Sequence, residues 1–394
     1  MTEAQYFDAI ASLTPQDQER IFGTVVDPKD VTIIKAGFNS IGGCVVGSDG
    51  PVFVKFTPVG SREQGKELVS AAKKDFTSIP PVHAIHVLFE GQQKSPVLVQ
   101  RAAELSSLED IFAVLTISEL VDARFVPLVD LMRSHGITTI QTAGASVDSS
   151  WFDFEALQAL YQDIVTEMME IHQLPVDRMT LPGRKEAYKE GIQHVITSSE
   201  RFDTIAGFVD GIPHAAEVIK PQDISFLRTE MQRLVHEYAQ HAHTRIVPIH
   251  GDLWMANRLV AQDEQGDIKS RLIDPAPVEY GDRGYDVTFA LADLVFTQAQ
   301  RTHGSTFVGE YTDVAESLLQ RYAKESGDTD IRKYMALFFM YKAFVAALFD
   351  AGENQVLREK LLSAARGVAV LSREKDFQFS WQMLDTYASY GKTI

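Results

Sequence analysis

Hydrophobic and polar residues alternate with a short period in the first part of the chain. Between residues 31 and 56, β-branched runs are separated by glycine-containing turns, which predicts strands at Val31–Lys35, Gly43–Gly47 and Val52–Phe56. The elements expected next are a helix at Ser61–Asp75 and two strands at Ala84–Phe89 and Val97–Gln100. This order predicts a small antiparallel sheet with one helix packed on it.

After about Ala103 the apolar residues recur at spacings of three and four, which is typical of helices. A strand-rich insert at Arg245–Asp274 interrupts this pattern, and the Gly/Ser/Thr-rich segment Gly136–Ser150 is expected to be a loop or a lid. An N-terminal helix is expected within Thr2–Gly23. The helices expected after Ala103 are Leu105–Met132, Phe152–His172, Arg184–Ser199, Asp223–His241, Tyr285–Phe296, Val314–Ser326, Arg332–Phe349 and Leu357–Leu371.

Composition narrows the functional classes. The chain has 394 residues, 45% of them hydrophobic, so it has enough apolar side chains for two or three packed domains. A net charge of −17 argues against nucleic-acid binding and suits a cationic small-molecule partner. Cys44 is the only cysteine, which excludes an intrachain disulfide and a multi-cysteine zinc site. With no membrane-spanning apolar run and no signal-peptide pattern, we expect a cytoplasmic protein that does not engage membranes.

The most specific chemistry lies in the segment from His250 to Asn257. Asp252 and Asn257 follow an expected strand at Ile246–Ile249, and Asp274 ends the second strand of an expected hairpin. Phosphoryl transfer needs one carboxylate that activates or orients the attacking hydroxyl, and an amide with a second carboxylate that hold Mg²⁺ on the phosphates. We therefore predict that Asp252 is catalytic and that Asn257 and Asp274 bind Mg²⁺.

A lysine in the N-terminal sheet completes a nucleotide site. Lys55 lies among apolar residues in Val52–Phe56, where it either faces solvent or points at phosphates. In the turn one strand away, the backbone N–H groups of Phe38, Asn39 and Ser40 can approach phosphates closely. We predict that these four residues bind the nucleotide.

A carboxylate on the following helix is expected to hold Lys55 on the α- and β-phosphates. Glu67 is the candidate, and Glu63 lies one turn earlier on the same helix face, so the sequence leaves both open.

These residues carry a family resemblance. The chain resembles the aminoglycoside phosphotransferase and fructosamine kinase superfamily, small-molecule kinases with a protein-kinase-like fold. The matching motifs are Val52–Lys55, Ile171-His172-Gln173-Leu174-Pro175, His250–Asn257 with its Trp254, Ile273-Asp274-Pro275-Ala276 and Tyr280–Asp286.

The resemblance implies a fold and an ATP site. It implies an α+β, two-lobed protein-kinase-like fold, with a nucleotide-binding lobe over residues 1–103 and a mainly helical lobe over residues 104–394. It also implies a hinge in which backbone groups around Gln100 and Ala102 meet adenine, and a structural role for Asp286, which would brace the catalytic loop. ATP and Mg²⁺ are the expected cofactors, although the sequence does not distinguish ATP from GTP.

The acceptor is less defined. Met255-Ala256 and Gly284-Tyr285 depart from the fructosamine kinase pattern, so the expected hydroxyl acceptor is an aminoglycoside, a ketosamine or an amino sugar. The alternatives are a nucleotide-binding regulatory pseudo-enzyme, disfavoured by the intact residue set, and a protein kinase, disfavoured by the lack of an Ala-Pro-Glu segment after Asp274.

Three neighbouring residues have less specific interpretations. We expect His172 to pack or cap its helix and His250 to order the loop, and Trp254 either lines the acceptor pocket or fills the core.

Overall fold

The computed structural model describes residues 15–27, 31–36, 41–48, 50–59, 84–91, 111–119, 126–133, 139–142, 145–173, 202, 205–240, 245–262, 265–272 and 280–393. The chain forms two compact units. The first contains Met1–Asp153 and Arg258–Ile273, and the second contains Phe154–Asn257 and Asp274–Ile394. The predicted boundary at residues 103 and 104 lies outside the described residues and stays a prediction.

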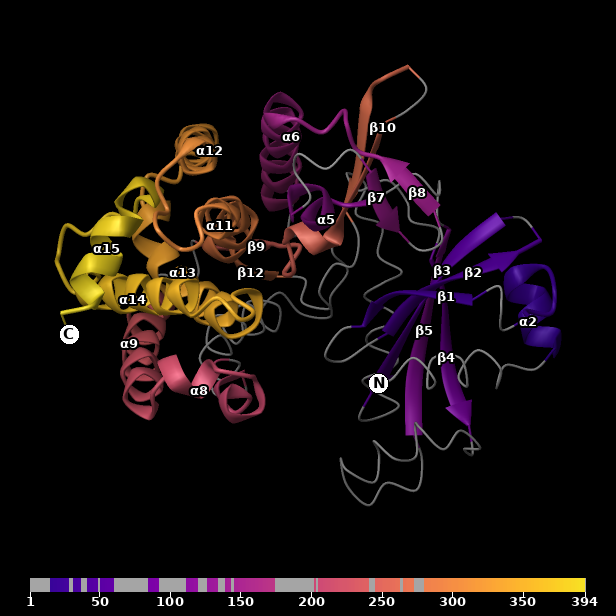
Figure 1. Ribbon diagram of the computed structural model, residues 1–394, viewed down its shortest axis with the longest axis horizontal. Helices are drawn as coiled ribbons and strands as arrows, with labels where there is room; N and C mark the ends of the chain where they lie inside the picture. Colours follow the sequence, from indigo (N-terminus) through magenta and orange to yellow (C-terminus); the bar gives the residue numbers. More distant parts are fainter. Residues whose placement is uncertain are drawn as a thin grey trace. The chain divides into compact units, whose positions relative to one another are not determined.

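A five-stranded antiparallel sheet lies in the first unit (Figure 1). Its strand order is β1-β2-β3-β5-β4, and each neighbouring pair is antiparallel. The strands are β1 (Val31–Ala36), β2 (Ile41–Gly47), β3 (Gly50–Val59), β4 (Ala84–Gly91) and β5 (Ile111–Glu119). Four of these strands confirm predictions, whereas the expected strand Val97–Gln100 and helix Ser61–Asp75 lie outside the described residues.

Between residues 105 and 150 one prediction is wrong, and a second segment has more regular structure than expected. The helix expected over Leu105–Met132 is replaced by β5, which pairs with β3 and β4, and by the short helix α5 (Leu128–Arg133). A short apolar run fits a buried strand as well as a helix. Here the segment forms a strand because it pairs with β3 on one side and β4 on the other. The loop or lid expected at Gly136–Ser150 contains a hairpin of β7 (Thr139–Thr142) and β8 (Ala145–Asp148).

The hairpin expected after Asn257 is confirmed. Strands β10 (Arg258–Gln262) and β11 (Ile268–Leu272) are antiparallel, and β10 also pairs with β6 (Val126–Pro127). At the N-terminal side, α2 (Pro15–Phe22) confirms the last part of the expected N-terminal helix.

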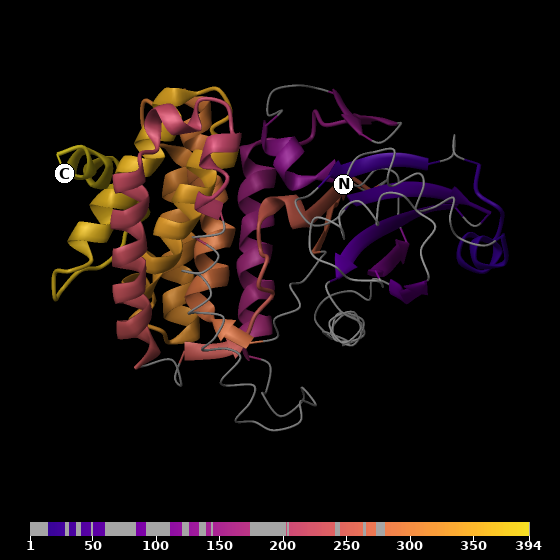
Figure 2. The ribbon, with the colours of Figure 1, turned by 90° about the horizontal axis from the view of Figure 1, so that it is seen from below.

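The second unit is mainly helical, as predicted, so the α+β class is confirmed. Figure 2 shows its long helices running side by side. Their bounds are α6 (Phe154–Gln173), α8 (Ala215–Val218), α9 (Pro221–Ala239), α11 (Arg283–Arg301), α12 (Glu310–Ser326), α13 (Ile331–Val345), α14 (Gln355–Leu371) and α15 (Leu384–Gly391). Shorter pieces are the 3₁₀ turns η3 (Val209–Gly211), η4 (Met255–Asn257) and η6 (Trp381–Met383), and a π-helical turn, η5 (Ala346–Asp350). The helix expected at Arg184–Ser199 lies outside the described residues.

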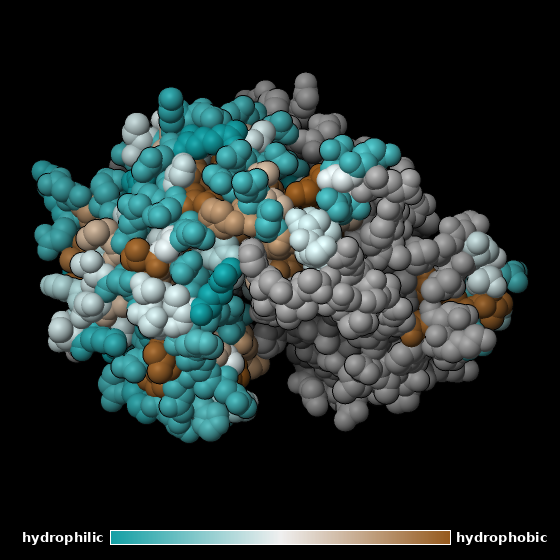
Figure 3. Space-filling model, turned by 45° about the horizontal axis from the view of Figure 1, so that its top comes forward, coloured by the Kyte–Doolittle hydropathy of each residue, from teal (hydrophilic) through white to brown (hydrophobic). Residues whose placement is uncertain are grey.

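Helix α13 is the centre of this unit. It packs against α9, α11 and α14, and its side chains from Tyr334 to Phe344 are buried on every face. Around it the outer helices present their polar faces, and Figure 3 shows hydrophilic residues over much of the helical surface in view. Within the described part of the chain, no helix is both long and apolar enough to span a membrane.

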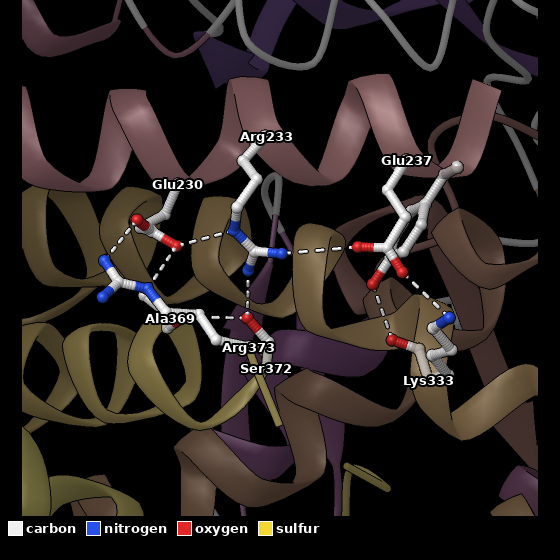
Figure 4. Close-up of polar contacts among 8 residues, drawn as sticks. Glu230, Arg233, Glu237, Lys333, Ala369, Ser372 and Arg373 are labelled. Carbon is white, nitrogen blue, oxygen red and sulfur yellow. Dashed lines mark hydrogen bonds and ion pairs between the residues drawn. The ribbon is translucent and has the colours of Figure 1, made fainter. Parts of the chain in front are cut away.

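A charged row ties α9 to the C-terminal helices (Figure 4). Glu230 accepts hydrogen bonds from Arg233 and from Arg373, just beyond α14. Arg233 also reaches Ser372, and Glu237 pairs with Lys333 of α13. These contacts fix α9 on the helices beneath it.

Candidate active site

The predicted catalytic loop runs from the end of β9 (Ile246–Pro248) into η4. Strand β9 pairs with β12 (Tyr280–Asp282), which leads directly into α11. At Gly251 the backbone has φ of 74°, a left-handed conformation that costs glycine little. The loop is largely buried, but Asp252 and Trp254 are partly exposed.

Asp286, in the first turn of α11, holds the beginning of this loop. Its two carboxylate oxygens accept the backbone N–H groups of His250, at 2.8 Å, and of Gly251, at 3.0 Å. Burial by itself would raise the pKa of Asp286, but the hydrogen bond and charge of His172, with help from His250, hold this pKa below its usual value. The loop-bracing contact that the resemblance implied for Asp286 is therefore present.

His172, near the end of α6, is the second partner of Asp286. Its Nε2 lies 3.3 Å from Asp286 Oδ2, and its Nδ1 lies 2.7 Å from the hydroxyl of Tyr322. Burial raises the pKa of Tyr322, which keeps its O–H protonated and able to donate to Nδ1. His172 thus links α6 and α12 to α11, which is more than the capping or packing role expected.

Asp252 and Asn257 are joined by the loop itself. Asn257 Nδ2 donates to the main-chain oxygen of Asp252 at 2.9 Å and to its Oδ2 at 2.7 Å. Asn257 is fully buried, and its own N–H donates to the carbonyl of Trp254 at 2.9 Å. The five-residue offset read from the sequence therefore does bring these two side chains together.

A further pair of residues at this loop was missed from the sequence. Asp293 of α11 accepts the N–H of Met255 at 3.0 Å, and Lys342 of α13 pairs with Asp293 at 3.0 Å. Two signals were available: Asp293 lies two helical turns after Asp286, and Lys342 is the one charge in the apolar stretch 334–345 of α13. Neither signal shows that Asp293 and Lys342 contact each other or the loop, because these contacts join segments that are far apart in the sequence.

The other predicted site residues stay predictions. Lys55 lies in β3, paired with Gly42 of β2 and Thr116 of β5. Those outside the described residues are Phe38, Asn39, Ser40, Glu67, Gln100, Ala102 and Asp274.

A comparison with known protein families gives a match that lies mostly in the helical unit. Residues 154–323 match the model of the ecdysteroid kinase-like family. The match covers less than half of the chain, and it contains Asp252, Asn257 and Asp286. The chain is thus similar to small-molecule kinases of the protein-kinase-like superfamily, which confirms the predicted resemblance at that level. Comparison with curated proteins gave no significant match.

Several solved structures are also similar. Aminoglycoside phosphotransferase APH(3'')-Id from Streptomyces rimosus is 13% identical, with 86% of this chain and 97% of that chain covered, at a TM-score of 0.46. A thermostable mutant of aminoglycoside phosphotransferase APH(4)-Ia is 15% identical, covering 89% and 98%, at 0.44. Spectinomycin phosphotransferase APH(9)-Ia, in complex with ADP and spectinomycin, is 12% identical, covering 96% and 98%, at 0.41.

Proposed function

We propose that this protein is a small-molecule kinase that transfers the γ-phosphoryl group of ATP to a hydroxyl group of its acceptor. Asp252 accepts a hydrogen bond from the acceptor hydroxyl and takes its proton as the hydroxyl oxygen attacks the γ-phosphorus. The bond between the γ-phosphorus and the oxygen that bridges it to the β-phosphate then breaks. The products are ADP and a phosphate monoester. The acceptor classes to test are aminoglycosides, ketosamines and amino sugars.

The observation that carries the proposal is the contact between Asn257 and Asp252. The amide nitrogen of Asn257 holds the Asp252 carboxylate at 2.7 Å, while Asp286 holds the two residues before Asp252 through their N–H groups. A partly exposed carboxylate is thus positioned by a buried scaffold. Most of the rate of phosphoryl transfer comes from such positioning and from charge stabilisation.

The chemistry of the proposed donor set suits a magnesium ion. With Nδ2 of Asn257 turned to Asp252, the amide oxygen is directed away from that carboxylate. Amide and carboxylate oxygens are the ligands that Mg²⁺ takes in such sites, so Asn257 and Asp274 are the residues that would hold it. Bound there, Mg²⁺ would neutralise phosphate charge. Lys55, paired with Glu67 or Glu63, would orient the α- and β-phosphates.

An acceptor screen tests the proposal. The purified chain is mixed with Mg²⁺ and ATP, and ADP formation is followed with aminoglycosides, ketosamines, amino sugars and choline-like amines. Acceptor-dependent ADP formation, with a phosphorylated acceptor identified by mass spectrometry, supports a small-molecule kinase. Nucleotide binding without transfer to any member of the panel contradicts the proposal and favours the regulatory pseudo-enzyme.

A further inference from the structure

The ammonium group of Lys342 lies in an unusual environment for a lysine. Its side chain is fully buried on α13, and its Nζ is 3.0 Å from Asp293 Oδ1. Two aromatic rings face the same ammonium: Nζ is 4.1 Å from the ring centre of Trp254 and 5.0 Å from that of Phe289. A desolvated cation over an aromatic face is attracted by the ring as well as by the carboxylate.

The same cluster contacts the candidate catalytic loop at two successive residues. Asp293 uses its other oxygen, Oδ2, to accept the N–H of Met255. Trp254, the preceding residue, presents its ring to Lys342. The indole Nε1 is buried and has no hydrogen-bond partner among the described residues. The ring contact with Lys342 is therefore the main polar interaction described for this side chain.

We infer that Lys342 is a positioning residue for phosphoryl transfer, which sets the Trp254–Met255 segment and, through it, the geometry of Asp252 and Asn257. This inference rests on the proposed function. Lys342 has no exposed surface, so it acts through Asp293 and Trp254 rather than on the substrate. Trp254 is partly exposed, and we place it as one wall of the acceptor site.

The physical reason lies in what Asp293 would do without the ammonium. A buried carboxylate that loses its counter-charge must take up a proton, recruit water or turn away. Each of these changes weakens its bond to the Met255 N–H. Trp254 loses its cation at the same time, so both ends of this dipeptide are released. Because small displacements of reacting groups cost much of the rate, turnover reports on this segment.

Two variants and one control separate positioning from stability. Lys342→Met removes the ammonium and leaves Asp293 uncompensated. Lys342→Met/Asp293→Asn also removes the carboxylate charge, and the asparagine oxygen still accepts the Met255 N–H. The matched control is Glu316→Gln on α12, because Glu316 is another buried carboxylate that pairs with an arginine, Arg332, and has no contact with the loop among the described residues.

Three measurements are made on each variant. They are hydrogen exchange of the loop amides by mass spectrometry, Trp254 fluorescence taken as the difference from the matching Trp254→Phe protein, and kcat and KM for an acceptor from the screen. For Lys342→Met we expect faster exchange at Met255, a shifted Trp254 emission and a loss in kcat of roughly tenfold to a hundredfold, with a nucleotide KM near that of the parent.

The double variant distinguishes a positioning role of Lys342 from a purely stabilising one. We expect it to regain the melting temperature of the parent while its Trp254 emission stays shifted and its kcat stays roughly tenfold low. Parent-like emission and kcat in the double variant would overturn the inference, and so would an equal loss of kcat in Glu316→Gln. Exchange and fluorescence need no substrate, so they show whether Lys342 holds the Trp254–Met255 segment even if every acceptor fails, and this distinguishes a failed inference from a rejected kinase activity.

Discussion

Asp286 and Asp293, two turns apart on α11, hold different parts of one loop: Asp286 binds the N–H groups of His250 and Gly251, and Asp293 binds that of Met255. Asp252 lies between these anchors in the chain. Helix α11 therefore acts as a rigid template for the loop. Substitutions of Asp286 or Asp293 are expected to affect activity by displacing Asp252.

Asp252→Asn should reduce kcat by about a hundredfold to ten-thousandfold, since a positioned proton acceptor contributes on this scale. The asparagine still offers an oxygen to the amide of Asn257, so the loop and the nucleotide Kd should change little. Steady-state kinetics and calorimetric titration with Mg·ATP measure the two effects. Turnover retained at the parent rate would remove Asp252 from the proposed mechanism.

Asp286→Asn should alter the pH dependence of stability. The folded-state pKa of Asp286 lies below the ordinary aspartate value of 3.8, so its ionised form stabilises the fold. That contribution is fully present above the unfolded-state pKa and is lost as pH falls through the folded-state pKa. Urea unfolding between neutral pH and about pH 3 should therefore show a smaller acid loss in Asp286→Asn than in the parent. Parallel pH curves for the two proteins would contradict this.

Asp282→Ala should be strongly destabilising. Asp282 accepts two hydrogen bonds from the buried guanidinium of Arg245 and caps α11 by accepting the N–H of Gly284 at 2.7 Å. Removing it leaves a buried cation with less compensation, which costs about 3–5 kcal/mol. Chemical denaturation measures the loss.

The control for this substitution is Glu325→Ala. Its carboxylate is exposed and pairs with Arg321 one turn earlier, so the expected change is below about 1 kcal/mol. Equal losses in the two variants would show that the Arg245–Asp282 pair is no more important than a surface pair.

Gly367→Ala should destabilise the C-terminal helices. A Cβ at this position of α14 would lie 1.9 Å from the carbonyl oxygen of Tyr387 in α15, so the helices must move apart. We expect a loss of about 1–3 kcal/mol, as for other overpacked sites. Gly211→Ala is the control, because its added methyl group meets nothing within 4 Å. Equal melting temperatures for the two variants would show that α14 and α15 do not pack this closely.

Local patterns predicted much of the fold. The strands β1–β4, the hairpin of β10 and β11 and most long helices were correct, because alternation and three-to-four spacing reflect which face of an element is buried. Strand β5 was predicted as a helix. Its apolar run suits either state, and its pairing with β3 and β4 joins segments far apart in the chain. The apolar residues of β5 do not by themselves indicate which distant strands they will pair with.

The sequence by itself determined the order of chemistry-bearing residues in the His250–Asn257 loop and the closeness of Asp252 to Asn257. Only four residues separate them along the chain, so one tight turn such as η4 is enough to bring them together. The tertiary structure decided which groups hold that loop. His172, Asp293 and Lys342 come from three different helices, and only the packing of α6, α11 and α13 brings them to it. Their identity depends on helix–helix distances, which no local spacing of residues specifies.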